Sequence, residues 1–306
     1  MPKKLQERVV IDGDSNLWKA PAVLTRRAED FSAVEQTKST GDRFTTDGFD
    51  LAEFWGRRLF AEGTVHFPKA EEEWLKLIFN NPAPECNGYV NFEENGKIDR
   101  IYVGRHWGRV LYKRTSKTLK ITPECEKKDY ITNAARFRTF DTVRVQYGLF
   151  DVLAADDLVK EFYRPDLNQT VRFGGRGAYE NMLISGFSGP EGFGRWIDGK
   201  GARLAFIQAG DKGTFDIKVG PFLYGDVKKQ RLVIRNDAGK LMQEIEVTGD
   251  TWVSLKIEDF AVDFEGIPLV GVSFETPDAQ SPESLGLNKD RRMLGVALKE
   301  IVVRAR

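Results

Sequence analysis

The sequence is poor in the residues that build metal and thiol sites. Its 306 residues include two cysteines, two histidines and four methionines. Cys86 and Cys125 each lack a histidine or second cysteine nearby, so they cannot complete a four-ligand structural zinc site. We expect both thiols to be reduced, and a disulfide between them is the less favoured alternative. The sequence therefore predicts no bound metal and no cofactor.

Long apolar runs are also missing. No stretch approaches the ~18 apolar residues of a membrane-spanning helix, and Met1-Pro2-Lys3-Lys4 leads into polar sequence without the apolar core of a secretion signal. This predicts no membrane span and a cytoplasmic location, or a periplasmic one if the sequence is part of a longer chain. With 41% hydrophobic and 30% charged residues, the composition excludes a disordered or fibrous protein.

A net charge is absent, since 46 basic residues balance 46 acidic ones. This balance gives no overall attraction to phosphate backbones and so argues against nucleic acid as a partner. Residues 97–144, however, hold thirteen basic and five acidic residues. This block is consistent with a cationic, aromatic surface for an anionic glycan, an anionic lipid or an acidic protein, and equally with a solvated strand face that protects a sheet edge. The candidate residues of such a surface are Arg100, Arg105, Trp107, Arg109, Lys113 and Arg114.

The first half of the chain predicts an extended arm followed by an α+β domain. Residues 1–47 sustain neither a strand nor a helix period. Residues 48–168 predict helices near 50–61, from Pro68 to Phe79 and over 151–163, because apolar residues recur there at helical spacing. Between them, Asn95-Gly96 separates two β-like runs and predicts a hairpin, followed by strands at 108–113, 118–121 and 142–147.

The second half, residues 169–306, predicts a jelly-roll-like antiparallel sandwich. Short β-like runs recur about every ten residues between Gly, Asp and Asn turns, which is typical of that architecture. The runs are 202–207, 214–219, 231–235, 242–247, 252–257, 270–275 and 294–303. The chain as a whole is therefore predicted to be mostly β.

Catalytic motifs are not recognisable. Ser188 in Gly186-Phe187-Ser188-Gly189-Pro190 differs from a nucleophile elbow because a proline stands where the second glycine is required. His66 and His106 lie in no metal-spaced pair, which favours packed or surface histidines over catalytic ones. The sequence therefore favours a protein that is not an enzyme.

Two segments of the second half carry a family resemblance. One contains Gly186, Phe187, Ser188, Glu191 and Trp196, and the other contains Ser281, Pro282, Leu285, Gly286, Asp290, Arg292, Leu294 and Gly295. Together they resemble the β-sandwich module appended to bacterial surface-glycan enzymes, including some glycosyltransferases and glucan phosphoglycerol transferases. The resemblance covers about residues 180–306 and implies a jelly-roll-like fold in a polysaccharide context.

The two segments offer a candidate carbohydrate site. Trp196 is suited to stacking on a sugar ring, and its neighbours Glu191, Arg195 and Asp198 are suited to bonding hydroxyl groups. The favoured alternative is structural: Trp196 fills the core, and Asp290 pairs with Arg292 or Arg195 to hold a loop. We expect Asp290 and Arg292 to form such a pair.

These observations predict a non-catalytic carbohydrate-binding or scaffolding protein of bacterial surface-polysaccharide biosynthesis or modification. The first alternative is a glycosyltransferase, or a glycan-modifying transferase or hydrolase, with its site in residues 85–170. The second is a structural or virion-associated β protein.

Overall fold

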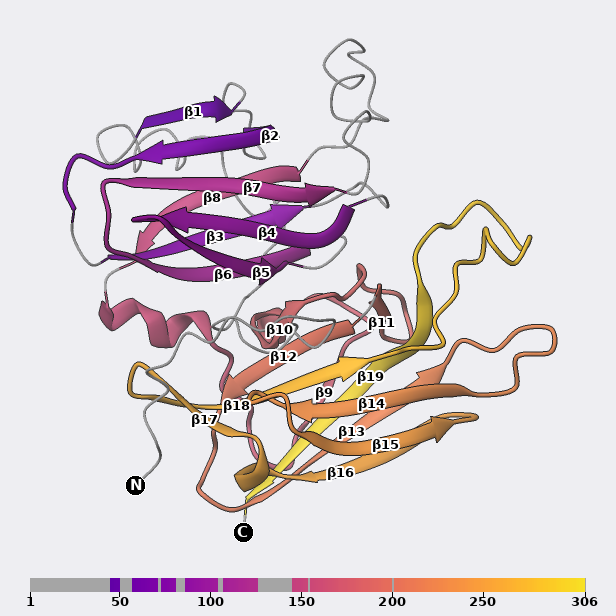
Figure 1. Cartoon of the computed structure of the whole chain (residues 1–306). Helices are drawn as coiled ribbons and strands as arrows, with labels where there is room; N and C mark the ends of the chain where they lie inside the picture. Colours follow the sequence, from indigo (N-terminus) through magenta and orange to yellow (C-terminus); the bar gives the residue numbers. More distant parts are fainter. Residues whose placement is uncertain are drawn as a thin grey trace. The chain divides into compact units, whose positions relative to one another are not determined.

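The protein is mostly β and forms two compact units, which divide between Leu158 and Val159 (Figure 1). The computed structural model describes residues 45–49, 57–70, 73–80, 86–103, 107–125, 145–153, 155–199 and 201–305. Most of the predicted arm lies outside these residues, and the predicted domain boundary at 168/169 stays a prediction. Within the described part of the chain, no helix has the length and hydropathy needed to span a membrane.

The unit before Val159 is built from antiparallel strands. In chain order these are β1 (Thr45–Phe49), β2 (Arg57–His66), β3 (Glu73–Asn80), β4 (Cys86–Glu94), β5 (Lys97–Tyr102), β6 (Trp107–Arg114), β7 (Thr118–Cys125) and β8 (Val145–Leu153). The strand order is β6-β3-β8-β2-β7-β4-β5, with β1 paired to β2. Phe92 of β4 packs against Phe79 of β3 and Tyr112 of β6, at ring-centroid distances of 5.9 and 5.1 Å. Since these strands are not neighbours in the sheet, the sheet folds over to enclose a core.

The predicted hairpin is confirmed, whereas the predicted helices are wrong. Strands β4 and β5 are joined by Asn95 and Gly96, both with positive φ, which suits a two-residue hairpin turn. The segment from Pro68 to Phe79, expected to be helical, contains β3 instead. Four consecutive residues of β3, Trp74 to Leu77, are buried, and the strand pairs with β6 and β8. A largely apolar run that is buried at every position, Lys76 included, suits a buried helix or a central strand, and partners on both edges select the strand.

The other two helix predictions are also replaced. The described part of 50–61 belongs to β2, and the segment 151–163 contains the end of β8 followed by the short 3-10 helix η3 (Ala155–Glu161). The register of the unit also places Cys86 of β4 directly opposite Cys125 of β7, a proximity that the sequence did not indicate. The reduced state of the two thiols stays a prediction.

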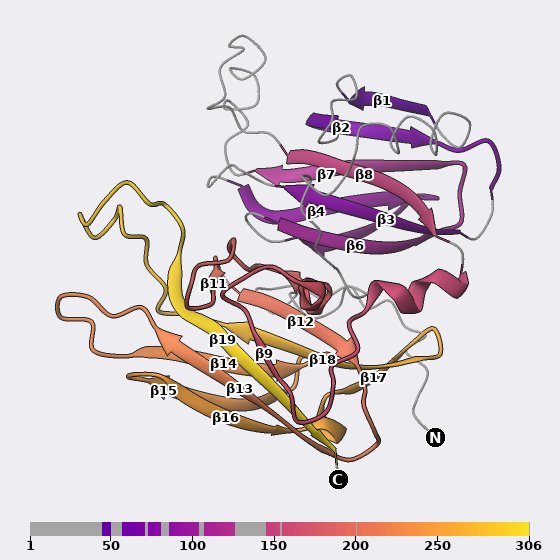
Figure 2. The same ribbon diagram turned by 180° about the vertical axis from the view of Figure 1, so that it is seen from behind.

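The unit from Val159 onward is a sandwich of two antiparallel sheets, as predicted (Figures 1 and 2). One sheet has the order β15-β14-β18-β12-β10 with β17 paired to β18, and the other has the order β11-β19-β13-β16 with β9 paired to β19. The strands of the first are β10 (Leu183–Ser185), β12 (Gly201–Ile207), β14 (Gln230–Asn236), β15 (Leu241–Val247), β17 (Ala261–Phe264) and β18 (Ile267–Glu275). Those of the second are β9 (Thr170–Arg172), β11 (Arg195–Asp198), β13 (Gly213–Pro221), β16 (Thr251–Lys256) and β19 (Leu294–Ala305), and the short helices are η4 (Ala178–Met182) and η5 (Ile257–Asp259).

The core of the sandwich lies between the two sheets. Phe206 of β12 meets Phe215 of β13 with ring centroids 5.7 Å apart, and Phe215 also contacts Phe260. Along β13 the buried residues Phe215, Ile217 and Val219 alternate with half-buried ones, as a strand with one face in a core requires. The opposite face of the β11-β19-β13-β16 sheet is therefore directed away from the core, and we call it the outer face.

Candidate functional site

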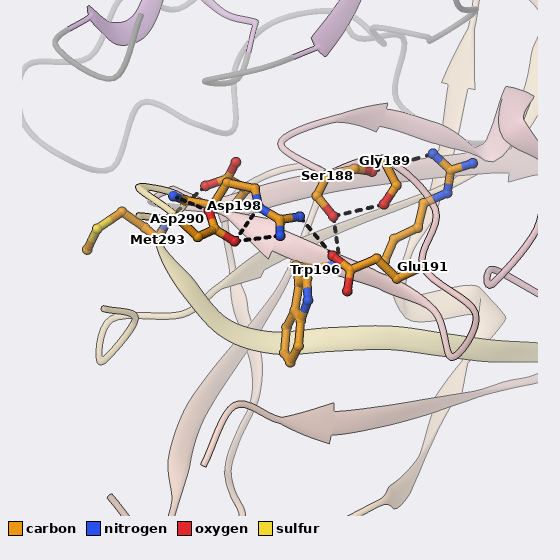
Figure 3. A network of polar contacts seen from close by, with 9 residues as sticks. Ser188, Gly189, Glu191, Trp196, Asp198, Asp290 and Met293 are labelled. Atoms are coloured by element: carbon orange, nitrogen blue, oxygen red, sulfur yellow. Dashed lines mark hydrogen bonds and ion pairs between the residues drawn. The ribbon is translucent and has the colours of Figure 1, made fainter. Parts of the chain in front are cut away.

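The first of the two segments that carry the family resemblance, from Gly186 to Trp196, forms a tight hairpin loop that leads into β11. Glu191 and Gly194 exchange two backbone hydrogen bonds of 2.9 Å each, which puts Phe193 at the tip of the turn. Ser188 fixes the other end, because its Oγ accepts a hydrogen bond from the backbone N–H of Trp196 at 3.1 Å and donates one to the carbonyl of Gly189 at 3.0 Å (Figure 3). The serine is thus used to shape the loop that carries Trp196.

The second segment, Ser281–Gly295, is joined to the first by Arg292, whose guanidinium lies between two carboxylates. Arg292 donates from Nη2 to Asp290 Oδ2 at 2.6 Å and from Nη1 to Glu191 Oε1 at 2.8 Å. These hydrogen bonds, that of Asp290 foremost, raise the pKa of the Arg292 guanidinium above its ordinary value. Asp290 and Arg292 therefore form the expected pair, and the carboxylate of Glu191 is bonded to the same arginine.

Replacing Asp290 with alanine should lower the stability of this cluster. Arg292 would lose its strongest partner but keep Glu191, and both side chains of the pair are about one-quarter exposed. We therefore expect a loss of about 1–2 kcal/mol, discounted from the value for a buried charged hydrogen bond. The melting temperature of Asp290→Ala should fall by a few degrees. Glu283→Ala, which breaks the exposed pair with Arg291, is the control, and an equal effect of both variants would contradict a special role of Asp290.

Two other predicted sugar ligands have structural roles. Arg195 is 7% exposed and forms an ion pair with Glu180. Asp198 is 2% exposed, and its Oδ1 accepts a hydrogen bond from the backbone N–H of Met293 at 2.9 Å, which ties β11 to the start of β19. Neither side chain is directed to solvent, and their role as ligands of sugar hydroxyls stays a prediction.

Trp196 belongs to a chain of aromatic rings on the outer face. Its neighbour in sequence, Ile197, lies in the core, so the indole is directed to the opposite side of the sheet. In Figure 3 it points away from the polar cluster around Asp198 and Asp290. The ring centroids of Phe193, Trp196, Phe222 and Tyr224 follow one another at 5.3, 5.7 and 5.9 Å. We call these four residues the aromatic strip.

The aromatic strip is open to solvent and firmly held. Phe193 is 42% exposed, and the other three side chains are half-buried. The backbone of Trp196 is held by Ser188: its N–H donates to Ser188 Oγ, and its carbonyl accepts a hydrogen bond from the N–H of Ser188. Phe222 is fixed because its N–H donates to the carbonyl of Gly295 at 2.7 Å and its carbonyl accepts from Gln230 Nε2 at 2.9 Å. The rings are therefore presented in a preorganised arrangement.

Charged side chains continue the same face toward the far edge strand. Lys299 Nζ lies 2.5 Å from Asp250 Oδ1 and 5.6 Å from the ring centroid of Phe193. Lys218 Nζ lies 3.8 Å from Asp250 and 3.5 Å from Glu300. We call Lys218, Lys299, Asp250 and Glu300 the charged bridge. It ends at Trp252 of β16, whose ring is 49% exposed and lies 5.9 Å from Lys218 Nζ.

The sequence identified one member of this surface, Trp196. It missed the other aromatic residues and the charged bridge, since they come from loops and strands far apart in the chain. A signal for Trp252 was present: it precedes Val253 and Leu255 at the alternating positions of β16, which places the tryptophan on the polar face. The remaining residues had no comparable signal.

The structure places two of the six candidate residues of the predicted cationic surface inside the unit, and the surface itself stays a prediction. Arg109 is fully buried, and Arg114 is 2% exposed and donates to the carbonyls of Lys69 and Ser116 at 2.9 Å. Arg100 forms a bidentate ion pair with Glu124, and its guanidinium lies over the ring of Tyr89. Lys113 is half-buried. Arg105 and the side chain of Trp107 lie outside the described residues. A polar side chain whose hydrogen bonds are satisfied can be buried in a β core, which accounts for the burial of Arg114.

Comparisons with known proteins assign no family to the chain. No protein-family model and no curated protein sequence matches it. Similar solved structures include the ANXUR1 extracellular domain from Arabidopsis thaliana, with 9% identity, coverage of 87% of this chain and 91% of that chain, and a TM-score of 0.24. The CBM22-1-CBM22-2 tandem domain from Paenibacillus barcinonensis Xyn10C has 12% identity, 93% and 98% coverage, and a TM-score of 0.24. The M60 catalytic domain with CBM51-1 and CBM51-2 from Clostridium perfringens ZmpB has 9% identity, 88% and 36% coverage, and a TM-score of 0.20. At these TM-scores the likenesses carry no assignment of fold or ligand.

Proposed function

We propose that the sandwich unit binds carbohydrate on its outer face, without catalysis. The observation that carries this proposal is the aromatic strip: four contacting rings, partly exposed, on a sheet face directed away from the core. Contiguous exposed apolar surface on a folded protein marks an interaction site. The negative face of an aromatic ring attracts the slightly positive C–H groups of a pyranose ring, so flat sugar rings match such a surface.

The neighbouring polar groups supply the second requirement of sugar binding. A pyranose carries hydroxyl groups that both donate and accept hydrogen bonds. Lysine ammonium groups donate and carboxylates accept, and the charged bridge offers both beside Phe193. Because backbone hydrogen bonds hold Trp196 and Phe222 in place and the four rings contact one another, little conformational entropy is lost on binding.

We extend the proposal to a polysaccharide of the bacterial cell surface as the ligand class. This step rests on the resemblance of Ser281–Gly295 to the module appended to surface-glycan enzymes. In the structure, that segment is joined to the loop of Trp196 through Arg292 and Glu191, so the residues of the resemblance support the loop that carries the aromatic strip.

The proposal predicts that Phe193→Ala weakens glycan binding. The full-length protein should retain glycans on an array, and the variant should retain them less because it loses the most exposed ring of the strip. A loss of about tenfold corresponds to about 1.4 kcal/mol, the upper range of one aromatic contact. Leu241→Ala is the matched control, since Leu241 is 47% exposed but belongs to the other sheet.

The same experiment separates binding from catalysis. Mass spectrometry of the retained glycans should show no change of mass, whereas cleaved or extended chains would favour the transferase or hydrolase alternative. If the array retains no glycan, or if Phe193→Ala and Leu241→Ala bind equally, the carbohydrate proposal is wrong.

A further inference from the structure

We infer that the ligand of this face is an uncharged chain of several sugar residues that extends from the aromatic strip to Trp252. The inference rests on the proposed function and adds the length and the charge of the ligand. Two features carry it. One is the spacing of the exposed aromatic residues across the sheet, and the other is the neutralisation of the charges between them.

The strand register gives the spacing. Trp196 is opposite Ala297, which is opposite Gly220, so these three residues share one row of the sheet. Trp252 is opposite Lys218, two residues before Gly220 on β13 and hence on the same face. Three strand spacings separate β11 from β16, so the Cα atoms of Trp196 and Trp252 lie about 16 Å apart. One sugar ring cannot contact both indoles, and a chain of several rings can.

The middle of this row is occupied by small residues, which have no long side chain above the sheet. Ala297 and Gly220 occupy it, and a Cβ added to Gly220 would meet Lys299 Cε at 2.5 Å and Asp250 Oδ1 at 2.8 Å. The side chain of Lys299 therefore lies across the glycine and along the sheet. The charged bridge thus lies over the middle of this row, and the exposed side chains of Phe193 and Trp252 flank it.

The charges of the bridge cancel. Its two lysines and two carboxylates are joined pairwise: Lys299 to Asp250, and Lys218 to Asp250 and Glu300. Further along the same two strands, an ion pair of 2.8 Å joins Arg304 of β19 to Asp216 of β13. Arg172 of β9 is the register partner of Glu300 and lies outside the line from Trp196 to Trp252.

An acidic sugar would gain little from such a surface. Its carboxylate would have to displace Asp250 or Glu300 from a lysine and would then lie beside the displaced carboxylate, and like charges at short range repel. A hydroxyl group can use the remaining donors and acceptors without breaking a pair. The bridge therefore favours neutral sugars, and their binding should depend weakly on salt.

The test uses the full-length protein and an array of neutral and acidic oligosaccharides that range from single sugars to long chains. We expect retention of long neutral chains only. Titration calorimetry with the best-retained chain should give the same Kd at low and high salt. Trp252→Ala should raise that Kd about tenfold, while Leu241→Ala should leave it unchanged. Because Trp252 is half exposed, its replacement should leave the melting temperature within a degree or two of the wild type.

The outcomes separate this inference from the proposed function. Retention of acidic glycans that weakens with salt, equal affinity for single sugars, or a Trp252→Ala variant that binds like the wild type would each overturn the inference while leaving carbohydrate binding intact. Retention of no glycan at all would overturn the proposed function and the inference together.

Discussion

Gly186→Ala should largely abolish the ordered pairing of β10 with β12 in the sandwich unit. Gly186 has φ +76, and a Cβ at this position would lie 2.0 Å from the carbonyl oxygen of Gly201. The left-handed conformation alone costs an alanine about 1–2 kcal/mol, and the overlap with backbone cannot be relieved by a side-chain rotation. The carbonyl of Gly186 also accepts the N–H of Asp198 at 2.8 Å, so a shift of this residue would disturb β11. We expect a total loss of at least about 4 kcal/mol.

Hydrogen exchange followed by mass spectrometry tests this expectation locally. Peptides that cover β10, β11 and β12 should lose protection in Gly186→Ala. Gly192→Ala is a matched control in the same loop, because no atom lies within 4 Å of a Cβ added there and its φ is not positive. Equal protection in the two variants would show that the backbone near Gly201 yields more easily than its hydrogen bonding implies.

Glu180→Ala should produce the second large loss. The variant leaves the guanidinium of Arg195 in a site where its side chain is 9% exposed, without its ion-pair partner. The neutral groups that remain beside it are the hydroxyl of Tyr179 and the carbonyls of Ser188 and Gly175, the latter two at 3.5 and 3.4 Å. Removing one member of a buried ion pair costs about 3–5 kcal/mol, because the remaining charge stays desolvated. Arg195 precedes Trp196, so this loss should also loosen the aromatic strip.

Thermal unfolding of the full-length protein measures this effect. Glu246→Ala makes the same substitution in an exposed pair with Lys229, where both side chains are about 60% exposed, and should change stability by less than about 1 kcal/mol. A variant Arg195→Met should partly restore Glu180→Ala, since it removes the unpaired charge. Glu180→Ala and Glu246→Ala with the same melting temperature would contradict the role assigned to Arg195.

The strands of the sandwich could be predicted because each carries its own signal. In β13, apolar Phe215, Ile217 and Val219 alternate with Asp216 and Lys218, and the strand begins with glycine. One face of such a strand must be buried and the other must meet water, so alternation identifies it without knowledge of its partners. The hairpin at Asn95-Gly96 could be predicted for a similar reason, since its turn type requires residues that tolerate positive φ.

In the first unit, the local sequence pattern does not determine the secondary structure or the surface charge. Residues Trp74 to Phe79 are apolar apart from Lys76, so the sequence of the run has no period that distinguishes a central strand from a helix. Only the pairing of β3 with β6 and β8 decides between them. The charge of residues 97–144 is equally ambiguous. It predicts a cationic surface, but Arg109 and Arg114 are buried, and Arg114 is bonded to backbone carbonyls, which composition cannot show.

The sequence by itself determined that this chain is mostly β, that its second half is a sandwich, and that Asp290 and Arg292 pair across one intervening residue. These properties depend on alternation, turn residues and short sequence separations. Only the tertiary structure decided which face of Trp196 meets solvent, and that Phe193, Phe222, Lys299 and Trp252 share that face. Such residues are brought together by strand order and register, in which β11 meets β19 and β13 meets β16. The pairing of distant strands is set by the packing of the whole core, which no single segment encodes.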